Sequence, residues 1–179
     1  MYYESTLDIT SAIHGDDLIS EGDEESLGVL DQQLAAHMDV KCLGRLGPDS
    51  KKALNYRKRS LYWTVEGFLW VGDGRHIDRS IELLDLTEAK PSDTPGSKAA
   101  GKSIRDALDE LPAAEAKLFQ QAAGTLNYIA VDRPDIQFSV KVILTGMSKP
   151  LVVSMHRVKR CLRYLKGKPT AAWVLAYQN

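Results

Sequence analysis

Residues 7–20 read Leu-Asp-Ile-Thr-Ser-Ala-Ile-His-Gly-Asp-Asp-Leu-Ile-Ser, and this stretch decides how the first part of the chain is built. Residues 7–13 roughly alternate between apolar and polar side chains, which predicts a strand. Residues 14–17 form a turn, and residues 18–20 lead out of it. We therefore expect a β-hairpin that carries its two adjacent carboxylates at the tip, both of them exposed.

Periodic patterns predict the elements that follow this hairpin. A loop rich in Pro, Gly and Ser covers residues 89–103, and three helices come after it. The expected elements are a helix at 23–36, a short strand at 40–46, a hairpin of 59–64 with 68–71, a short helix at 77–84, helices at 113–129, from Pro134 and at 152–166, and a strand at 171–177.

Apolar stripes on the last three helices predict a shared core of Leu126, Ile136, Val140, Ile143, Leu162 and Leu165. Phe138 and Val142 lie opposite the main stripe of the helix that begins at Pro134. We therefore expect that helix to be buried on two sides. Helices and strands together place the chain in the α+β class.

Composition indicates an ordinary globular protein of one domain, or one and a half, with 179 residues, 44% hydrophobic and 26% charged. Two distant cysteines, Cys42 and Cys161, fit neither a metal spacing nor a disulfide framework and suggest a reducing compartment. No apolar run reaches the roughly 20 residues of a membrane helix. We expect a soluble, intracellular protein without a membrane partner, in either the cytoplasm or the nucleus.

Charge is distributed unevenly along the sequence. Residues 1–40 contain no Lys or Arg but many carboxylates, whereas residues 149–179 contain no Asp or Glu. Such asymmetry is typical of a protein with a cation site at one end and a polyanion site at the other. Two solvated faces of opposite sign explain it equally well.

Asp16 and Asp17 are the candidate metal ligands. Two carboxylates aimed at one site can hold Mg²⁺ through oxygen atoms while substrate phosphates complete the octahedron. Two metals at such a site stabilise the attacking and leaving oxygens of phosphoryl transfer. A surface turn without any catalytic role is the alternative, because adjacent aspartates are common in turns.

The last helix carries cations with an aromatic residue among them, which suits contact with a nucleic-acid backbone. An amphipathic helix with a solvated basic face is the alternative. Arg133, between the preceding two helices, is expected to pair with an acid or to cap carbonyl groups. The candidate nucleic-acid contacts are Arg157, Lys159, Arg160, Arg163, Tyr164, Lys166 and Lys168.

Six segments in one order carry a resemblance to a known family. They are residues 14–17 (His-Gly-Asp-Asp), 43–47 (Leu-Gly-Arg-Leu-Gly), 90–95 (Lys-Pro-Ser-Asp-Thr-Pro), 126–136 (Leu-Asn-Tyr-Ile-Ala-Val-Asp-Arg-Pro-Asp-Ile), 147–150 (Met-Ser-Lys-Pro) and 160–169 (Arg-Cys-Leu-Arg-Tyr-Leu-Lys-Gly-Lys-Pro). From about residue 12 to the end, the chain resembles the reverse transcriptase region of copia-type retrotransposon Pol polyproteins. The His-Gly-Asp-Asp form looks most like the copia-like elements of dinoflagellates.

The resemblance implies a fragment of an RNA-directed DNA polymerase, a nucleotidyltransferase that uses Mg²⁺ and an RNA or DNA template–primer. A palm remnant would occupy residues 1–88, a linker 89–111, and a mainly helical thumb and connection region 112–179. Asp16 and Asp17 would be catalytic and would bind the metal. His14, where the family usually has Tyr, and Gly15 would lie near the primer or nucleotide.

The family takes a third metal-binding Asp from an upstream strand, and Asp8 is a poor substitute because it lies on the same short strand as the turn. We therefore expect the chain to be inactive alone and to depend on the rest of a polyprotein or on a second chain. Two alternatives remain open: a nucleic-acid-binding module built on the basic helix, and a degenerate gene product without a selected function.

Overall fold

The structure is a computed structural model that describes residues 1–97 and 108–177. It contains both helices and antiparallel strands, which confirms the α+β class. In chain order the elements are β1 (Tyr2–Glu4), β2 (Ile9–His14), β3 (Asp17–Glu21), α1 (Glu24–His37), β4 (Leu54–Tyr56), β5 (Arg59–Thr64), β6 (Gly67–Val71), α2 (Arg75–Leu83), α3 (Ala113–Ile129), η2 (Pro134–Ile136), α4 (Gln137–Leu144), α5 (Val152–Gly167) and β7 (Ala172–Ala176).

These elements pack into two compact units. The strand-rich unit comprises Met1–Trp70 together with the chain from Val174 onward, and the helical unit comprises Val71–Trp173. The packing boundary near residue 70 lies inside the segment 1–88, because α2 packs against α3 and α5. The division into a palm remnant, a linker and a thumb and connection region stays a prediction.

The strand-rich unit contains two β-sheets. One sheet has the order β1-β2-β3, and the other has the order β4-β5-β6-β7. Both predicted hairpins are confirmed, the second with β6 beginning at Gly67. The predicted helix is also confirmed as α1, with Asp23 as its N-cap accepting a hydrogen bond from Ser26 N at 2.7 Å.

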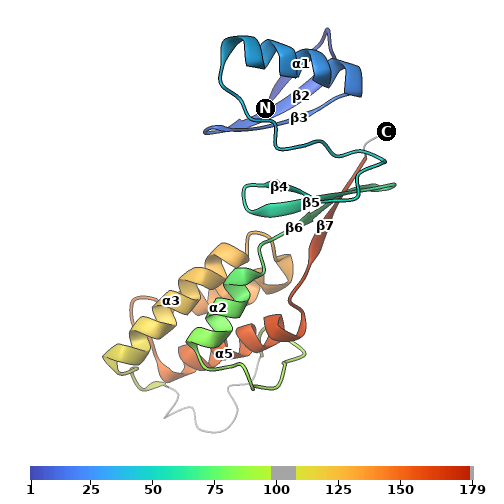
Figure 1. The fold of residues 1–179 in the computed structure, drawn as a ribbon. Coiled ribbons are helices and arrows are strands. Elements are labelled where there is room, and N and C mark those ends of the chain that lie inside the picture. Colours follow the sequence, from blue (N-terminus) through green and yellow to red (C-terminus); the bar gives the residue numbers. More distant parts are fainter. Residues whose placement is uncertain (98–107, 178–179) are drawn as a thin grey trace. The chain divides into compact units, whose positions relative to one another are not determined.

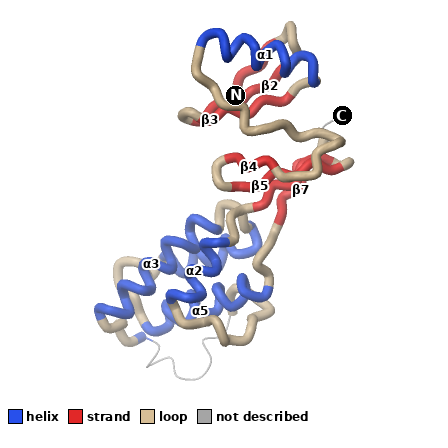
Figure 2. The backbone as a smooth tube through the Cα atoms, viewed as in Figure 1, coloured by secondary structure: helices blue, strands red, loops and turns tan. Residues whose placement is uncertain are grey.

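The predicted strand at residues 40–46 is wrong. Figure 2 shows the chain between α1 and β4 as a loop. Gly44 has a φ of 140°, and Gly47 and Pro48 follow it closely. A strand also needs a neighbouring strand to bond with, and none pairs with this stretch in the described part of the chain.

The helical unit is built around one hydrophobic core to which α2, α3, α4 and α5 all contribute. Figure 1 shows α2, α3 and α5 side by side in this unit. All six residues predicted to share a core lie in it, and each is at most 2% exposed. The three predicted helices are confirmed, although Pro134 opens the 3₁₀ turn η2 and the α-helix proper begins at Gln137.

The expectation that α4 is buried on two sides is wrong, because Phe138 is 78% exposed. The described part of the predicted linker, residues 89–97, forms no helix or strand, and residues 98–107 lie outside the described residues. Ala89 packs on the helical core, so the start of that segment is attached to the helical unit.

Candidate functional site

The turn between β2 and β3 carries the candidate carboxylates. His14 pairs with Asp17 across the hairpin, so Gly15 and Asp16 are the two residues of the turn itself. Gly15 has a φ of 62° at the first turn position, where a tight hairpin turn of type II′ favours glycine. The hairpin predicted from the sequence is therefore confirmed, with the glycine where the backbone requires it.

The two carboxylates differ in exposure. Asp16 is exposed, whereas Asp17 is partly buried, so the expectation that both are exposed is wrong for Asp17. Asp17 belongs to β3 and is the cross-strand neighbour of His14. Within residues 1–97 and 108–177, neither carboxylate forms an ion pair with Lys or Arg.

The donor atoms at the turn are of the type that Mg²⁺ takes, since carboxylate oxygens are hard ligands. No group of three or more His, Cys, Asp or Glu side chains that could hold a metal ion occurs among the described residues. Two carboxylates from this hairpin therefore fit Mg²⁺ in chemistry, but they make up only part of a coordination shell.

Arg45 forms ion pairs with two carboxylates of the acidic segment, which the sequence did not predict. Its guanidinium donates to the Glu24 carboxylate and to Asp31 Oδ2, the latter at 2.7 Å. Both acids lie on α1, and Arg45 comes from the loop after it, which spacing alone does not show. The acidic character of residues 1–40 is thus partly neutralised in the fold.

Three of the candidate nucleic-acid cations on α5 hold the segment at residues 86–94. Arg160 Nη2 donates to Thr94 Oγ1 at 2.8 Å, and Arg163 Nε donates to the Lys90 carbonyl at 2.5 Å. Lys166 Nζ donates to the carbonyl oxygens of three residues, which are Leu86 (3.4 Å), Ala89 (3.0 Å) and Thr87. These cations have internal partners that a polyanion would need to displace.

Tyr164 lies inside the unit, 7% exposed, and donates its hydroxyl hydrogen to Asp135 Oδ2 at 2.9 Å. Burial, with the hydrogen bond to Asp135, raises the pKa of the Tyr164 hydroxyl. Its predicted place among exposed nucleic-acid contacts does not agree with this burial. The sequence period placed Tyr164 among the cations opposite the apolar stripe, whereas in the fold its hydroxyl reaches Asp135 in the α3–α4 connection.

Arg133 organises the same buried network, as its expected structural role requires. Its Nε and Nη2 atoms donate to the two Asp135 oxygens at 2.9 and 2.7 Å, and Nη1 donates to the Lys168 carbonyl at 2.8 Å. The guanidinium lowers the pKa of the Asp135 carboxyl. The network ties the α3–α4 connection to the end of α5.

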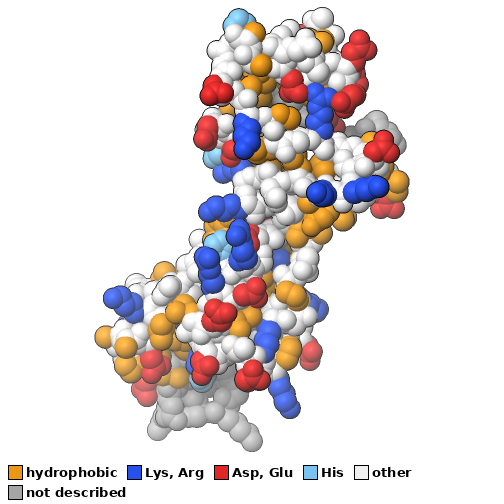
Figure 3. Space-filling view, viewed as in Figure 1, with side chains coloured by type: hydrophobic (Ala, Val, Ile, Leu, Met, Phe, Trp, Pro, Cys, Tyr) orange, Lys and Arg blue, Asp and Glu red, His pale blue; other side chains and the backbone are white. Residues whose placement is uncertain are grey.

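The remaining candidate cations are Arg157, Lys159 and Lys168. Arg157 and Lys168 are exposed, and Lys159 is partly buried. Lys168 Nζ lies 5.1 Å from the centre of the Tyr164 ring. On the face shown in Figure 3, acidic and basic side chains are mixed over both units, so the charge asymmetry of the sequence does not produce a single patch there.

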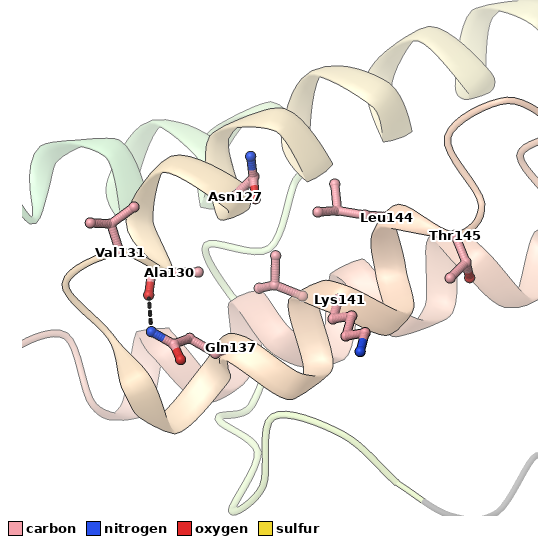
Figure 4. Close-up of a pocket in the computed structure, with 8 residues that line it drawn as sticks. Asn127, Ala130, Val131, Gln137, Lys141, Leu144 and Thr145 are labelled. Carbon is pink, nitrogen blue, oxygen red and sulfur yellow. Dashed lines mark hydrogen bonds between the residues drawn. The ribbon is translucent and has the colours of Figure 1, made fainter.

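A groove between α3 and α4, with a volume of about 510 Å³, was also missed by sequence analysis. Ala130, Val140 and Leu144 line it together with polar side chains, and the Gln137 amide donates to the Ala130 carbonyl at 3.1 Å (Figure 4). Lys141 is the charged residue of its lining. The groove depends on how two helices cross, which side-chain periodicity does not specify.

No helix among the described residues is long and apolar enough to cross a membrane. No protein-family model and no solved structure matches the chain.

The curated proteins that the chain resembles include the following three. It is 24% identical over 156 residues to "Uncharacterized mitochondrial protein AtMg00810" of Arabidopsis thaliana, covering 87% of this chain and 60% of that protein. It is 29% identical over 164 residues to "Retrovirus-related Pol polyprotein from transposon TNT 1-94" of Nicotiana tabacum, covering 87% of this chain and 12% of the polyprotein. It is 30% identical over 105 residues to the corresponding polyprotein from transposon RE1 of Arabidopsis thaliana, covering 55% of this chain and 7% of that polyprotein.

The chain therefore spans only part of each of these relatives. Two of these three relatives are retrovirus-related Pol polyproteins from transposons, which is the class of protein that the six sequence segments indicate. The chain is thus related to a part of the Pol polyproteins of copia-type retrotransposons, as its motifs predict.

Proposed function

We propose that this chain is part of the reverse transcriptase region of a copia-type Pol polyprotein, the region that synthesises DNA on an RNA template. The observation that carries the proposal is the hairpin in which Asp16, a turn residue, is followed directly by Asp17, the first residue of β3. The order of the later motifs and the similarity to transposon polyproteins support the same assignment.

In this proposal the Asp16 and Asp17 carboxylates supply oxygen ligands for Mg²⁺ beside the primer end and the incoming nucleotide. The metal would supply charge stabilisation for phosphoryl transfer. His14 and Gly15 would lie next to the primer or nucleotide, because they belong to the same turn. A further carboxylate must come from outside the described residues, where the polyprotein relatives are longer.

Manganese binding tests the metal site without depending on activity. Mn²⁺ substitutes for Mg²⁺ and broadens the NMR signals of nearby nuclei. We expect the amide signals of residues 15–17 to broaden before those of other acidic positions, and Asp16→Asn to remove this selectivity. Asp39→Asn is the matched control, since it removes an exposed carboxylate of the same acidic segment. Uniform broadening along residues 1–40 would contradict the site.

Primer extension tests the completeness of the site. With two carboxylates and no further ligand, the chain alone should not extend a primer on an RNA or DNA template with Mg²⁺ or Mn²⁺. Extension by the isolated chain that disappears in Asp16→Asn would show that the site is complete without further chain.

A nucleic-acid-binding module is the second candidate function, and the charge of residues 113–173, a part of the helical unit, favours it. Residues 113–173 carry the acids Glu115, Asp132 and Asp135 against the cations Lys117, Arg133, Lys141, Lys149, Arg157, Lys159, Arg160, Arg163, Lys166 and Lys168. Such an excess attracts phosphates and releases their counterions.

The test uses the candidate cations that do not hold the segment at residues 86–94. If Arg157, Lys159 and Lys168 each neutralise one phosphate, the logarithm of duplex affinity should fall with that of salt with a slope of about −3. Reversal of Arg157 and Lys159 to Glu should abolish binding, whereas reversal of Lys117, an exposed cation at the start of α3, should weaken it little. Binding that survives the double reversal would exclude this face of α5.

A further inference from the structure

β7 is an edge strand with an unusual composition. It ends the four-stranded order β4-β5-β6-β7, so one side of its backbone pairs with β6 and the other carries no strand among the described residues. All five of its residues are exposed, including Trp173 (42%), Val174 (58%) and Leu175 (46%). An exposed edge of apolar residues is a template for pairing with another strand.

The other edge strands of the structure carry the charges that prevent such pairing. β1 contains Glu4, and β3 contains both Asp17 and Glu21. β4 is three residues long and is flanked by Lys52 on one side and by Arg57 and Lys58 on the other. β7, in contrast, has no charged residue and no proline from Thr170 to Tyr177, so nothing in it opposes a further strand.

The edge of β7 that faces β6 is fixed by contacts with β6 and the turn before it. The opposite edge is therefore presented by an ordered strand. Gly67 lies so close that a Cβ atom there would be 2.1 Å from the Leu175 carbonyl oxygen. Tyr177 N donates to the Glu66 carbonyl at 3.2 Å, and the Tyr177 ring meets the Phe68 ring edge-on at 5.7 Å. A strand ordered before binding loses less conformational entropy when a partner adds to it.

We propose that β7 pairs antiparallel with β7 of a second copy of this chain, around a two-fold axis at Val174. Backbone groups of alternate residues point to opposite edges of a strand. Because Tyr177 N points inward to Glu66, the groups of Val174 and Ala176 point outward. In the antiparallel pair, Val174 exchanges hydrogen bonds with Val174 of the other copy, and Ala172 does so with Ala176.

A second copy fits this edge because pairing brings no like charges together. An uncharged strand facing itself has none to oppose, whereas a pair of β4 edges would bring Lys52, Arg57 and Lys58 of two copies together. A two-fold contact also uses the same surface on both partners and closes after two chains, so it produces a dimer and no filament. This inference does not depend on the proposed function.

The test combines oligomeric state with charge pairing at Val174. We expect the unaltered chain to pass from monomer to dimer as concentration rises, measured by sedimentation or by light scattering after gel filtration. Val174→Lys and Val174→Glu should each remain monomeric over the same range, because the two-fold axis places like charges opposite each other. An equimolar mixture of the two variants should dimerise again.

Val65→Lys is the matched control, because Val65 is an 82% exposed apolar residue at the turn between β5 and β6. This variant should dimerise like the unaltered chain. At a concentration low enough to keep the unaltered chain monomeric, circular dichroism should show the same melting behaviour for all four proteins. A chain that stays monomeric at every concentration, a Val174→Lys variant that still dimerises, or assembly beyond two copies would each overturn the proposal.

Discussion

In the helical unit, apolar side chains of α2, α3, α4 and α5 meet in one buried cluster, whereas in the strand-rich unit the buried apolar side chains among the described residues are Ile9 and Leu61. Each fully buried large apolar side chain stabilises a fold by about 1.5 to 3 kcal/mol. The helical unit can therefore rely on its own core. The strand-rich unit depends more on strand pairing, on its turns and on whatever covers its exposed strands.

This contrast sets the size of the expected effects. Substitutions in the helical core remove or disrupt burial directly. Those in the strand-rich unit act through backbone conformation, where single contributions are smaller but form a larger share of the stability.

The largest effect is expected from Leu162→Asp in α5. Leu162 is fully buried within the helical core, and a carboxylate there would have no partner. We expect a loss of about 4 kcal/mol or more, enough to unfold the helical unit. Urea denaturation followed by circular dichroism measures it, with Val131→Asp, at a 65% exposed position of the same unit, as the control. Equal losses in the two variants would show that the described core is not what holds the unit together.

Gly67→Ala should have the largest effect in the strand-rich unit. Gly67 has a φ of 146°, which disfavours any other residue, and the added Cβ would meet the Leu175 carbonyl. The strain should cost about 2 to 3 kcal/mol and release β7 from β6. Hydrogen exchange at the β7 amides measures the release directly.

Gly47→Ala is the matched control, because a Cβ there meets nothing within 4 Å and the residue has no left-handed φ. Unchanged protection of β7 in Gly67→Ala would mean that β7 does not rest on this glycine.

The same contrast explains which features of the fold could be predicted from the sequence. Stripes at helical spacing predict the core residues Leu126, Ile136 and Leu162, because local period alone decides which side of a helix can be buried. The period cannot tell whether a second apolar side finds a partner, and so it fails for Phe138. It also cannot show that the α3–α4 connection covers Tyr164, since that depends on distant packing.

The candidate site shows the same division between local and distant information. Residues 14–17 include Gly15, the residue type that a tight hairpin turn favours, so the hairpin could be predicted from the local sequence. The role of Arg45 does not, because its partners lie 14 and 21 positions away on α1. Likewise, the carbonyl groups that bind Lys166 come from a segment that precedes it by more than 75 positions. Irregular segments carry no period from which such contacts could be predicted.

A smaller effect, with a pH dependence, is expected at Asp73 beside the N-terminus of α2. Arg75 donates to the Asp73 carboxylate through Nε at 2.9 Å and Nη2 at 2.6 Å, which lowers the pKa of Asp73 from 3.8 to about 2. A carboxyl with a lowered folded-state pKa stabilises the fold above its unfolded value and loses that contribution as pH falls through the folded one.

Asp73→Asn should therefore cost about 1 kcal/mol at pH 6 and almost nothing near pH 2. Urea denaturation at the two pH values measures the difference. If Asp73→Asn lowers the free energy of unfolding by the same amount at both pH values, the effect does not come from the charge of the Asp73 carboxylate.

The smallest effect is expected at the turn between β4 and β5, and there it should be a gain. Tyr56 pairs with Arg59, so Arg57 and Lys58 form a two-residue turn, with φ values of 49° and 61°. Left-handed backbone costs a residue with a side chain about 1 kcal/mol, a cost that glycine avoids. Lys58→Gly should therefore stabilise the strand-rich unit by about 0.5 to 1 kcal/mol.

Lys52→Gly provides the control, because Lys52 does not have a left-handed φ and glycine there only increases the freedom of the unfolded chain. Hydrogen exchange of the β4 and β5 amides should slow in the first variant and quicken slightly in the second. If both variants exchange faster than the parent, turn strain does not limit this unit, and its weakness lies in its small buried core.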